Sequence, residues 1–509
     1  DFRAGWWVVD GGPTGIIGSY DWFETPRVQA ARAGGEGGSW TPGALAPWLD
    51  TKYPDALAQL AAFRADLMRS AVALPHLLPG AKPAPRARFG AHLTALWGAP
   101  MRDGLAMKAL AHVARGARTI EYWAFGPEWQ LPADGWSEAP RAYTEIARAN
   151  QRLAWADTLL AEGERPPGRV AIQAEGPSAL WSVDTSAHLV EPALLHAALT
   201  HAGYPVELVD DASLALGVLE NNVDVLFLTQ LHTDAAAQEA VARWVEQGGG
   251  TVVVLPGAGT RDEVDAPSRR LDKILGVTAR SSATMVLGPL IPGRFGYERA
   301  GDLTPEPGVE PAWQVPRGEV LRVPCATAPC ARDAIAGRFT ASGAEVLARL
   351  GGEPAISRRR WPSGGAALQY GFFPGLQHWL QAEGRNAAAL PTGHHPEQRA
   401  WAALAPANIE RARPPGTLRP AITSVPGVEA AVVRAPKGTA LVLFNWTGAP
   451  LPRGVTITLY DPRPFTIAVR DEQTPVAFRP VRGGVELTVP LDKVEVVRLC
   501  REQGVRDCR

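Results

Sequence analysis

The clearest pattern in the chain lies between residues 168 and 277, where short apolar runs alternate with longer amphipathic segments. The runs hold five or six residues and are rich in β-branched side chains, whereas the segments between them repeat apolar residues every three or four positions. Such runs predict buried strands and such segments predict helices, as in a doubly wound parallel sheet. The predicted strands are residues 169–173, 205–209, 224–229 and 251–255, and the predicted helices lie near residues 192–202 and 241–245.

Residues 1–165 carry a looser mixture of apolar runs and amphipathic segments. A complete (β/α)8 barrel takes about 250 residues, and this part supplies three or four strand–helix units, so we expect the C-terminal part of such a barrel. The sequence GERPPG at residues 163–168 ends it. The predicted strands are residues 5–10, 16–20, 88–93 and 119–123, and the predicted helices are residues 54–70, 103–115 and 137–160.

Beyond Val277 the pattern changes to Pro- and Gly-rich strands and turns. We interpret them as a β-rich extension of the second domain, which then covers residues 168–410. A Pro-rich joint at residues 412–420 leads to about ninety residues of alternating strands. These strands predict a small antiparallel β-sandwich over residues 415–509. The chain is therefore expected to be an α/β protein of three domains.

Charge and hydropathy narrow the classes of function. The chain of 509 residues has 51 Lys and Arg against 52 Asp and Glu, a net charge of -1. A protein surface without an overall positive electrostatic field does not attract nucleic acid or an acidic membrane. The longest apolar run, which Glu220 and Asp224 interrupt, falls short of the roughly 18 residues that a transmembrane helix needs. We therefore expect neither nucleic acid nor a membrane as partner.

The four cysteines form two close pairs, Cys325 with Cys330 and Cys500 with Cys508. They are too few for a disulfide scaffold and lack the spacing of a zinc site, so no metal is expected. Two local disulfides would slightly favour an exported protein, while four ordinary thiols fit the same spacing. The chain begins with Asp rather than Met, which we interpret as the removal or omission of a preceding segment.

Acids and aromatic residues gather where predicted strands of the first domain end. SYDWFETP follows the strand at residues 16–20, and IEYWAFGPEW contains the strand at residues 119–123. Groups at the C-terminal ends of barrel strands are well placed for acid/base chemistry, and paired carboxylates permit glycoside hydrolysis. Indole rings beside them suit the C–H faces of sugars. The candidate catalytic residues are Glu128, Asp21 and Glu24, and the candidate substrate-binding residues are Trp22, Trp123, Trp129, His92 and Glu121.

Each candidate also has a structural interpretation. Asp21 could cap a turn, and Glu24 could be a solvated loop acid. Glu121 could pair with Arg118, because structural ion pairs also perturb carboxylates. His92, on an apolar strand, could be a satisfied core residue.

The second domain shows no chemistry of its own. A doubly wound sheet of this kind also carries glutamine amidotransferases, whose chemistry needs a nucleophilic Cys at a strand-to-helix elbow. Residues 170–277 contain no Cys, and no G-x-G-x-x-G follows the first strand. We therefore assign this domain a structural or assembly role.

The succession of these parts resembles the family 42 glycoside hydrolases, the β-galactosidases with a trimerisation domain. The most specific stretch is similar to that amidotransferase-like trimerisation domain; it runs over residues 228–265, from LTQLHTDAAAQEAVARWV to GAGTRDEVD. GSYDWFETP and MRDGLAMKALAHVARGARTIEYW resemble the sixth and eighth barrel strands of the family. The resemblance implies a carbohydrate substrate, no cofactor, and a homo-oligomer, a trimer built by the second domain.

The chain departs from the family at the catalytic positions. The acid/base Glu of the family lies on the fourth barrel strand, in an N-terminal barrel segment that this chain lacks. The segment FGAHLTALWGAP resembles the seventh strand, yet it places Leu93 or a neighbour where the family has its nucleophilic Glu. The four-Cys zinc cluster of the family is absent too. The sequence thus predicts a glycoside hydrolase-like protein that acts on β-galactosides or related glycans through carboxylates. The alternative is a non-catalytic carbohydrate-binding or assembly protein on the same scaffold.

Overall fold

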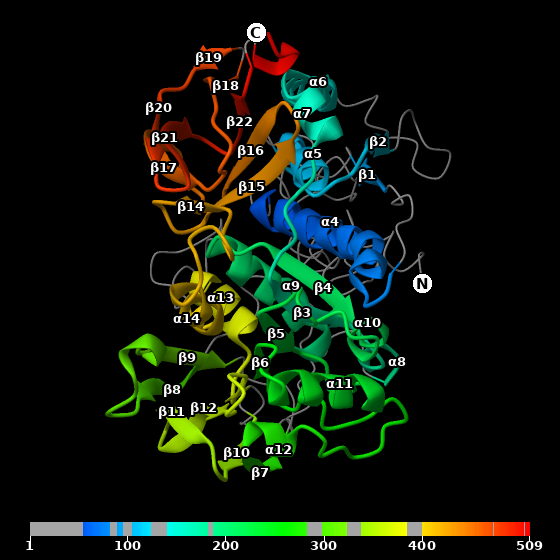
Figure 1. The fold of residues 1–509 in the computed structure, drawn as a ribbon, viewed down its shortest axis with the longest axis vertical. Helices are drawn as coiled ribbons and strands as arrows, with labels where there is room; N and C mark the ends of the chain where they lie inside the picture. The colour runs from blue at the N-terminus through cyan, green and yellow to red at the C-terminus, as the bar shows by residue number, and fades with distance from the viewer. Residues whose placement is uncertain are drawn as a thin grey trace, which may run out of the picture.

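The fold is shown in Figure 1, a computed structural model that describes residues 54–81, 89–94, 104–123, 140–181, 187–281, 298–322, 337–383, 400–471, 473–502 and 504–508. The strands predicted near residues 5–10 and 16–20 lie outside these ranges.

Helices and two parallel strands make up the described residues before 163. Strands β1 and β2 confirm the strands predicted near residues 88–93 and 119–123. The helix predicted over residues 137–160 is broken at Ala156, because the short second piece turns to bury Leu159 and Leu160 among apolar side chains of residues 431–444. The elements are α4 (Pro54–Leu77), β1 (Gly90–Thr94), α5 (Gly104–Ala114), β2 (Thr119–Trp123), α6 (Pro140–Trp155) and α7 (Asp157–Glu162).

A nine-stranded mixed sheet forms the middle of the molecule, in the order β4-β3-β5-β6-β13-β12-β11-β8-β9. The strands from β4 to β13 are parallel, and those beyond β13 are antiparallel. The four predicted parallel strands are confirmed as neighbours. Their bounds and those of the others are β3 (Val170–Glu175), β4 (Val206–Asp210), β5 (Val225–Leu228), β6 (Thr251–Val254), β8 (Glu298–Pro305), β9 (Gly318–Arg322), β11 (Glu345–Leu350), β12 (Glu353–Arg360) and β13 (Ala366–Tyr370).

The β-rich extension belongs to this same sheet, since β13 pairs in parallel with β6. Both faces of the parallel part are buried. Val225 and Phe227 of β5 enter one core while Leu226 and Leu228 enter another, which explains why the strands have continuous apolar runs. The remaining elements of this part are α8 (Ser178–Trp181), α9 (Ala187–His201), α10 (Asp211–Ala215), α11 (Ala235–Glu246), α12 (Asp272–Leu275), β7 (Val277–Arg280), β10 (Phe339–Ala341), α13 (Pro374–Glu383) and α14 (Leu404–Arg411).

Two antiparallel sheets that share one apolar core form the C-terminal part, as the alternating pattern predicts. Cys500 and Cys508 form a disulfide that ties the chain end to β22, while Cys325 and Cys330 lie outside the described residues. One sheet holds β14 (Ala421–Thr423), β17 (Leu451–Leu459), β21 (Gly484–Leu491) and β20 (Phe478–Val481), and the other holds β15 (Val428–Ala435), β16 (Gly438–Asn445), β22 (Val494–Cys500), β18 (Ile467–Arg470) and β19 (Thr474–Pro475).

Helix α4 joins the parts, because it crosses the molecule between the sandwich and the nine-stranded sheet (Figure 1). It covers the edge strand β4. The Leu208 backbone N–H donates to Ser70 Oγ (3.0 Å), and Arg69 Nη2 donates to the Val206 carbonyl oxygen (2.9 Å). Two side chains of the helix thus satisfy backbone groups that an edge strand would leave open.

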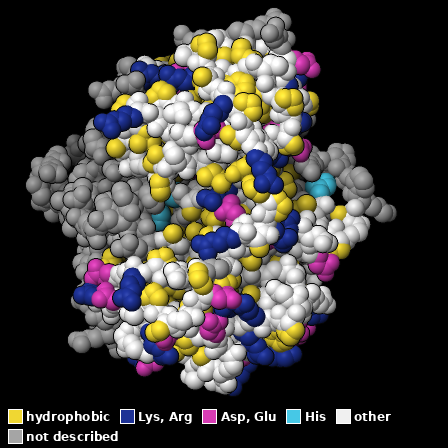
Figure 2. Space-filling model, turned by 60° about the vertical axis from the view of Figure 1, so that its left-hand side comes forward, with side chains coloured by type: hydrophobic (Ala, Val, Ile, Leu, Met, Phe, Trp, Pro, Cys, Tyr) yellow, Lys and Arg dark blue, Asp and Glu magenta, His cyan; other side chains and the backbone are white. Residues whose placement is uncertain are grey.

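The described surface has a mixed character. On the face in Figure 2, basic, acidic and apolar side chains are interspersed, in keeping with the net charge of -1. None of the helices within the described ranges has the length and hydropathy that a bilayer crossing requires.

Candidate active site

The carboxyl ends of β1 and β2 lie side by side, where a barrel enzyme would place its catalytic groups. The two strands pair in parallel and in simple register, from Gly90 opposite Thr119 to Thr94 opposite Trp123. A Cβ on Gly90 would sit 2.1 Å from Thr119 Oγ1, so glycine permits this close start of the ladder. The register sets His92 directly opposite Glu121.

The two faces of this strand pair have different roles. Ala91 and Leu93 are buried in a core with α5, and Ile120 and Tyr122 pack against the same core. The Tyr122 hydroxyl donates to Asn150 Oδ1 of α6 (2.8 Å), and burial raises the pKa of Tyr122 to about 12. Helices α5 and α6 therefore cover this face of the strand pair.

Successive residues of a strand alternate between its faces, so Glu121 belongs to the face opposite the helices. Glu121 is exposed there. The guanidinium of Arg118, its structural partner in the alternative interpretation, donates to the carbonyl oxygens of Leu160 and Gly163. Among the candidate substrate-binding residues, the structure describes the side chain of Glu121 alone.

The other candidate residues lie outside the described part of the chain. This holds for the three candidate catalytic acids and for two of the indole rings: Asp21, Glu24, Glu128, Trp22 and Trp129. The backbone of Trp123 and of His92 is described, and their side chains are not. The site is therefore defined here by the ends of β1 and β2 and by Glu121.

A buried cluster of charged side chains, the junction cluster, lies where the three parts of the molecule meet. At its centre the Asp66 carboxylate of α4 accepts from Arg115 Nε (2.7 Å), Arg69 Nε (3.0 Å), Arg165 and His196 Nε2 (2.9 Å). Burial alone would raise the pKa of Asp66, but the three guanidinium groups hold this pKa well below its usual range. Asp66 is therefore ionised at neutral pH.

Two further carboxylates balance the charges of the junction cluster. Glu207 of β4 accepts from Arg69 Nη1 (2.9 Å) and from the Gly168 backbone N–H (2.7 Å). Glu429 of β15 accepts from Arg115 and from Trp446 Nε1 (3.1 Å). Burial lowers the pKa of His196, which leaves its imidazole neutral at pH 7. Three carboxylates then face three guanidinium groups, which satisfies the requirement that buried charges be paired.

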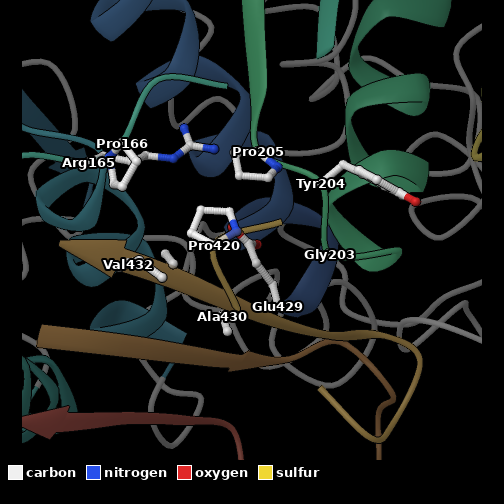
Figure 3. Close-up of a pocket in the computed structure, with 10 residues that line it drawn as sticks. Arg165, Pro166, Gly203, Tyr204, Pro205, Pro420, Glu429, Ala430 and Val432 are labelled. Atoms are coloured by element: carbon white, nitrogen blue, oxygen red, sulfur yellow. The ribbon is translucent and has the colours of Figure 1, made fainter. Parts of the chain in front are cut away.

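A small cavity borders this cluster (Figure 3). Arg165 and Pro166 of the linker, Pro205 before β4, and Glu429 of β15 line it. Its volume of about 10 Å³ holds one water molecule at most. This cavity is therefore too small for a sugar.

The sequence analysis missed the junction cluster. The sequence does contain a sign of this cluster, because charged residues stand within largely apolar helices. Examples are Asp66 in FRADLMRSA and Arg115 at the end of LAMKALAHVAR. Among the described residues, no group of three or more His, Cys, Asp or Glu side chains could hold a metal ion.

No protein-family model and no curated protein matches this sequence. The similar solved structures include a β-galactosidase from Rahnella sp. R3, with a TM-score of 0.57, 17% identity, and coverage of 87% of this chain and 58% of that one. A β-galactosidase from Halorubrum lacusprofundi has a TM-score of 0.52 and 15% identity, with coverage of 90% of this chain and 59% of that one. A catalytic mutant of a GH42 β-galactosidase from G. stearothermophilus has a TM-score of 0.51 and 15% identity, with coverage of 89% of this chain and 58% of that one. The chain thus has the fold of these proteins and spans less than two thirds of their length.

Proposed function

We propose that this chain belongs to a glycoside hydrolase that acts on β-galactosides or related glycans. The observation that carries the proposal is the likeness of fold to β-galactosidases over 87% to 90% of the chain. The parallel pair of β1 and β2 supports it, because the exposed Glu121 lies near the ends of these strands.

The proposed chemistry is acid/base hydrolysis through two carboxylates. One carboxylic acid protonates the leaving glycosidic oxygen, while the other carboxylate attacks the sugar or activates a water molecule. Glu128 is the first candidate, because it follows β2 by only five residues. Asp21 and Glu24 are the further candidates, and Trp22, Trp123 and Trp129 are proposed to stack on the sugar rings.

The test is hydrolysis of 4-nitrophenyl β-D-galactoside by the full chain and its variants. Glu128→Gln is expected to lower kcat by about 100-fold or more while KM changes little, since a group that moves a proton in the transition state contributes on that scale. Glu162→Gln, which changes an exposed acid on α7, is the matched control. An unchanged kcat for Glu128→Gln would remove Glu128 from the catalytic pair and transfer the test to Asp21→Asn and Glu24→Gln.

A second candidate function is a non-catalytic carbohydrate-binding or assembly protein. The observation that favours it is that β1, from Gly90 to Thr94, carries no acid. Such a protein would bind galactosides without turning them over.

We also propose that residues 168–410 build a trimer. Sedimentation equilibrium of the full chain tests this: a mass of three chains supports the trimer, and a mass of one chain contradicts it.

A further inference from the structure

The loops after three parallel strands meet at one point of the nine-stranded sheet. From β3 the chain continues to β4 on one side, and it then crosses back to β5 on the other side. The carboxyl ends of β3 and β5 therefore flank a switch point, which is where doubly wound sheets bind ligands. Helix α8 follows β3 there, His232 follows β5, and the loop of residues 255–268 follows β6.

Trp181 presents a half-exposed indole at this switch point, with 52% of its surface accessible. One ring face lies on the His232 imidazole, with ring centroids 6.0 Å apart and planes inclined by 20°. Trp181 Nε1 donates to the Glu263 carbonyl oxygen (3.0 Å). The ring is thus held from behind and at its edge, so an incoming molecule meets a surface that is already ordered.

His232, which supports the indole, is itself fixed from two sides. Its backbone N–H donates to Ser178 Oγ (2.8 Å), and its Nε2 lies 2.9 Å from Asp265 Oδ1. Its side chain is only 4% exposed, and its Nδ1 has no hydrogen-bond partner among the residues that the structure describes. A buried ring nitrogen without a partner is uncommon in folded proteins.

The surroundings of the indole combine apolar and acidic groups. Leu180 and Val264 are exposed by 87% and 68% and widen the apolar surface. The loop beside them, Arg261 to Asp265, contains three acids and one base. Burial raises the pKa of Asp234, and the nearby carboxylates of Glu263 and Asp210 raise it further, so negative charge is concentrated at this edge. This combination disfavours an anionic ligand and offers acceptors to hydroxyl groups.

We propose that Trp181 is the stacking platform of a second saccharide-binding site, at the switch point of the sheet and distinct from the site at the ends of β1 and β2. An apolar C–H face of a sugar ring would lie on the open face of the indole. The sugar hydroxyls would donate to the half-exposed Asp265 carboxylate and to the oxygen atoms of Glu263, which already accepts from the Ala235 backbone N–H (2.8 Å). The choice of a saccharide rests on the proposed function, whereas the ordered platform does not.

The test is affinity electrophoresis of the full chain in native gels that contain soluble β-1,4-galactan. Trp181→Ala is expected to weaken retardation and to raise the apparent dissociation constant about tenfold, because the stacking surface is lost. Val264→Arg is the second variant, because it changes an exposed residue next to Glu263 and does not depend on the packing of the indole. Tyr143→Ala, which removes a ring that is 47% exposed on α6, is the matched control and should leave retardation unchanged.

The outcomes separate this site from the site at the ends of β1 and β2. The platform is supported if Trp181→Ala and Val264→Arg both weaken retardation while Tyr143→Ala leaves it unchanged. This holds even if the chain cleaves no galactoside. Retardation that neither variant changes, or an absence of retardation in the parent chain, overturns it even if the chain is an active hydrolase. If Trp181→Ala lowers the mass measured by sedimentation, this surface is a contact between protein chains, and the saccharide-binding proposal is also overturned.

Discussion

Asp66 of α4 and Arg115 at the end of α5 form an ion pair of 2.7 Å in which neither side chain is exposed to solvent. Arg115 also binds Glu429 of the sandwich, and Asp66 also binds Arg165 of the linker and His196 of α9. The pair is therefore the centre of a joint that connects all three parts of the molecule.

Replacement of Asp66 by Asn should destabilise the whole chain. The substitution leaves three buried guanidinium groups facing two carboxylates, and removal of one partner from a buried pair costs about 3–5 kcal/mol. We expect the free energy of unfolding, measured by urea denaturation at pH 7, to fall by that amount. A single transition that remains cooperative would show that the three parts unfold together.

The matched control for this substitution is Asp302→Asn. Asp302 pairs with Arg299 at the surface, where the two side chains are 59% and 57% exposed. An exposed pair contributes less than about 1 kcal/mol. If the two Asp→Asn substitutions cost the same, the junction cluster is not the stabilising joint inferred here.

Stability should fall with rising pH because of Glu191. This buried carboxyl of α9 accepts from the backbone N–H groups of Gly375 (2.6 Å) and Leu376 (2.8 Å), and burial raises its pKa to about 8. The folded state then holds a proton that the unfolded state releases above its ordinary pKa of about 4.5. The free energy of unfolding therefore declines between about pH 4.5 and 8, by at most about 1.4 kcal/mol per pH unit.

Glu191→Gln provides the check on this titration, because the amide keeps the shape of the side chain and carries no titrating proton. Urea denaturation of the parent chain and of the variant at pH 5, 6, 7 and 8 gives the difference in stability between them. We expect this difference to shift in favour of the variant as the pH rises. Parallel pH profiles for the two proteins would contradict the raised pKa.

The disulfide between Cys500 and Cys508 should stabilise the sandwich. It closes a short loop, for which the loss of chain entropy in the unfolded state corresponds to about 2.5 kcal/mol. Paired Cys500→Ala and Cys508→Ala substitutions should lower the free energy of unfolding by that amount. Dithiothreitol should produce a similar loss in the parent chain and no further loss in the double variant, and a parent chain indifferent to reductant would contradict the prediction.

Local pattern was sufficient to predict individual strands but not their long-range pairing. The run TIEYW predicts a strand over residues 119–123, and β2 has those bounds. By contrast, β13 pairs with β6 across more than one hundred residues of chain, which no local period encodes. The break at Ala156 was missed for a related reason, because the apolar spacing continues through it and only the burial of Leu159 and Leu160 in another part of the fold ends α6 there.

The candidate site divides in the same way. Strand ends, and hence the neighbourhood of Glu121 and Trp123, follow from the sequence pattern. The register that sets His92 opposite Glu121 depends on how two strands approach in space, and the sequence does not specify it. Three of the four partners of Asp66 lie 49, 99 and 130 positions away along the chain, so the junction cluster could not be assembled from spacing.

Glu121→Ala should weaken the proposed hydrolysis through binding. Glu121 is exposed on the face of β2 that the helices do not cover, where its carboxylate can accept hydrogen bonds from sugar hydroxyl groups. Loss of a hydrogen bond to a charged group costs about 1.5 kcal/mol or more, which corresponds to about tenfold in kcat/KM. For 4-nitrophenyl β-D-galactoside we expect most of this loss to appear as a higher KM.

Tyr122→Phe, one position along the same strand, is the control for Glu121→Ala. Tyr122 lies on the face that the helices cover and its hydroxyl donates to Asn150 of α6, so loss of this hydroxyl should lower the free energy of unfolding by about 1 kcal/mol and leave KM and kcat unchanged. Steady-state kinetics and urea denaturation of both variants separate the two faces of β2. If Tyr122→Phe raises KM as much as Glu121→Ala does, the assignment of Glu121 to a substrate-facing side of the strand is wrong.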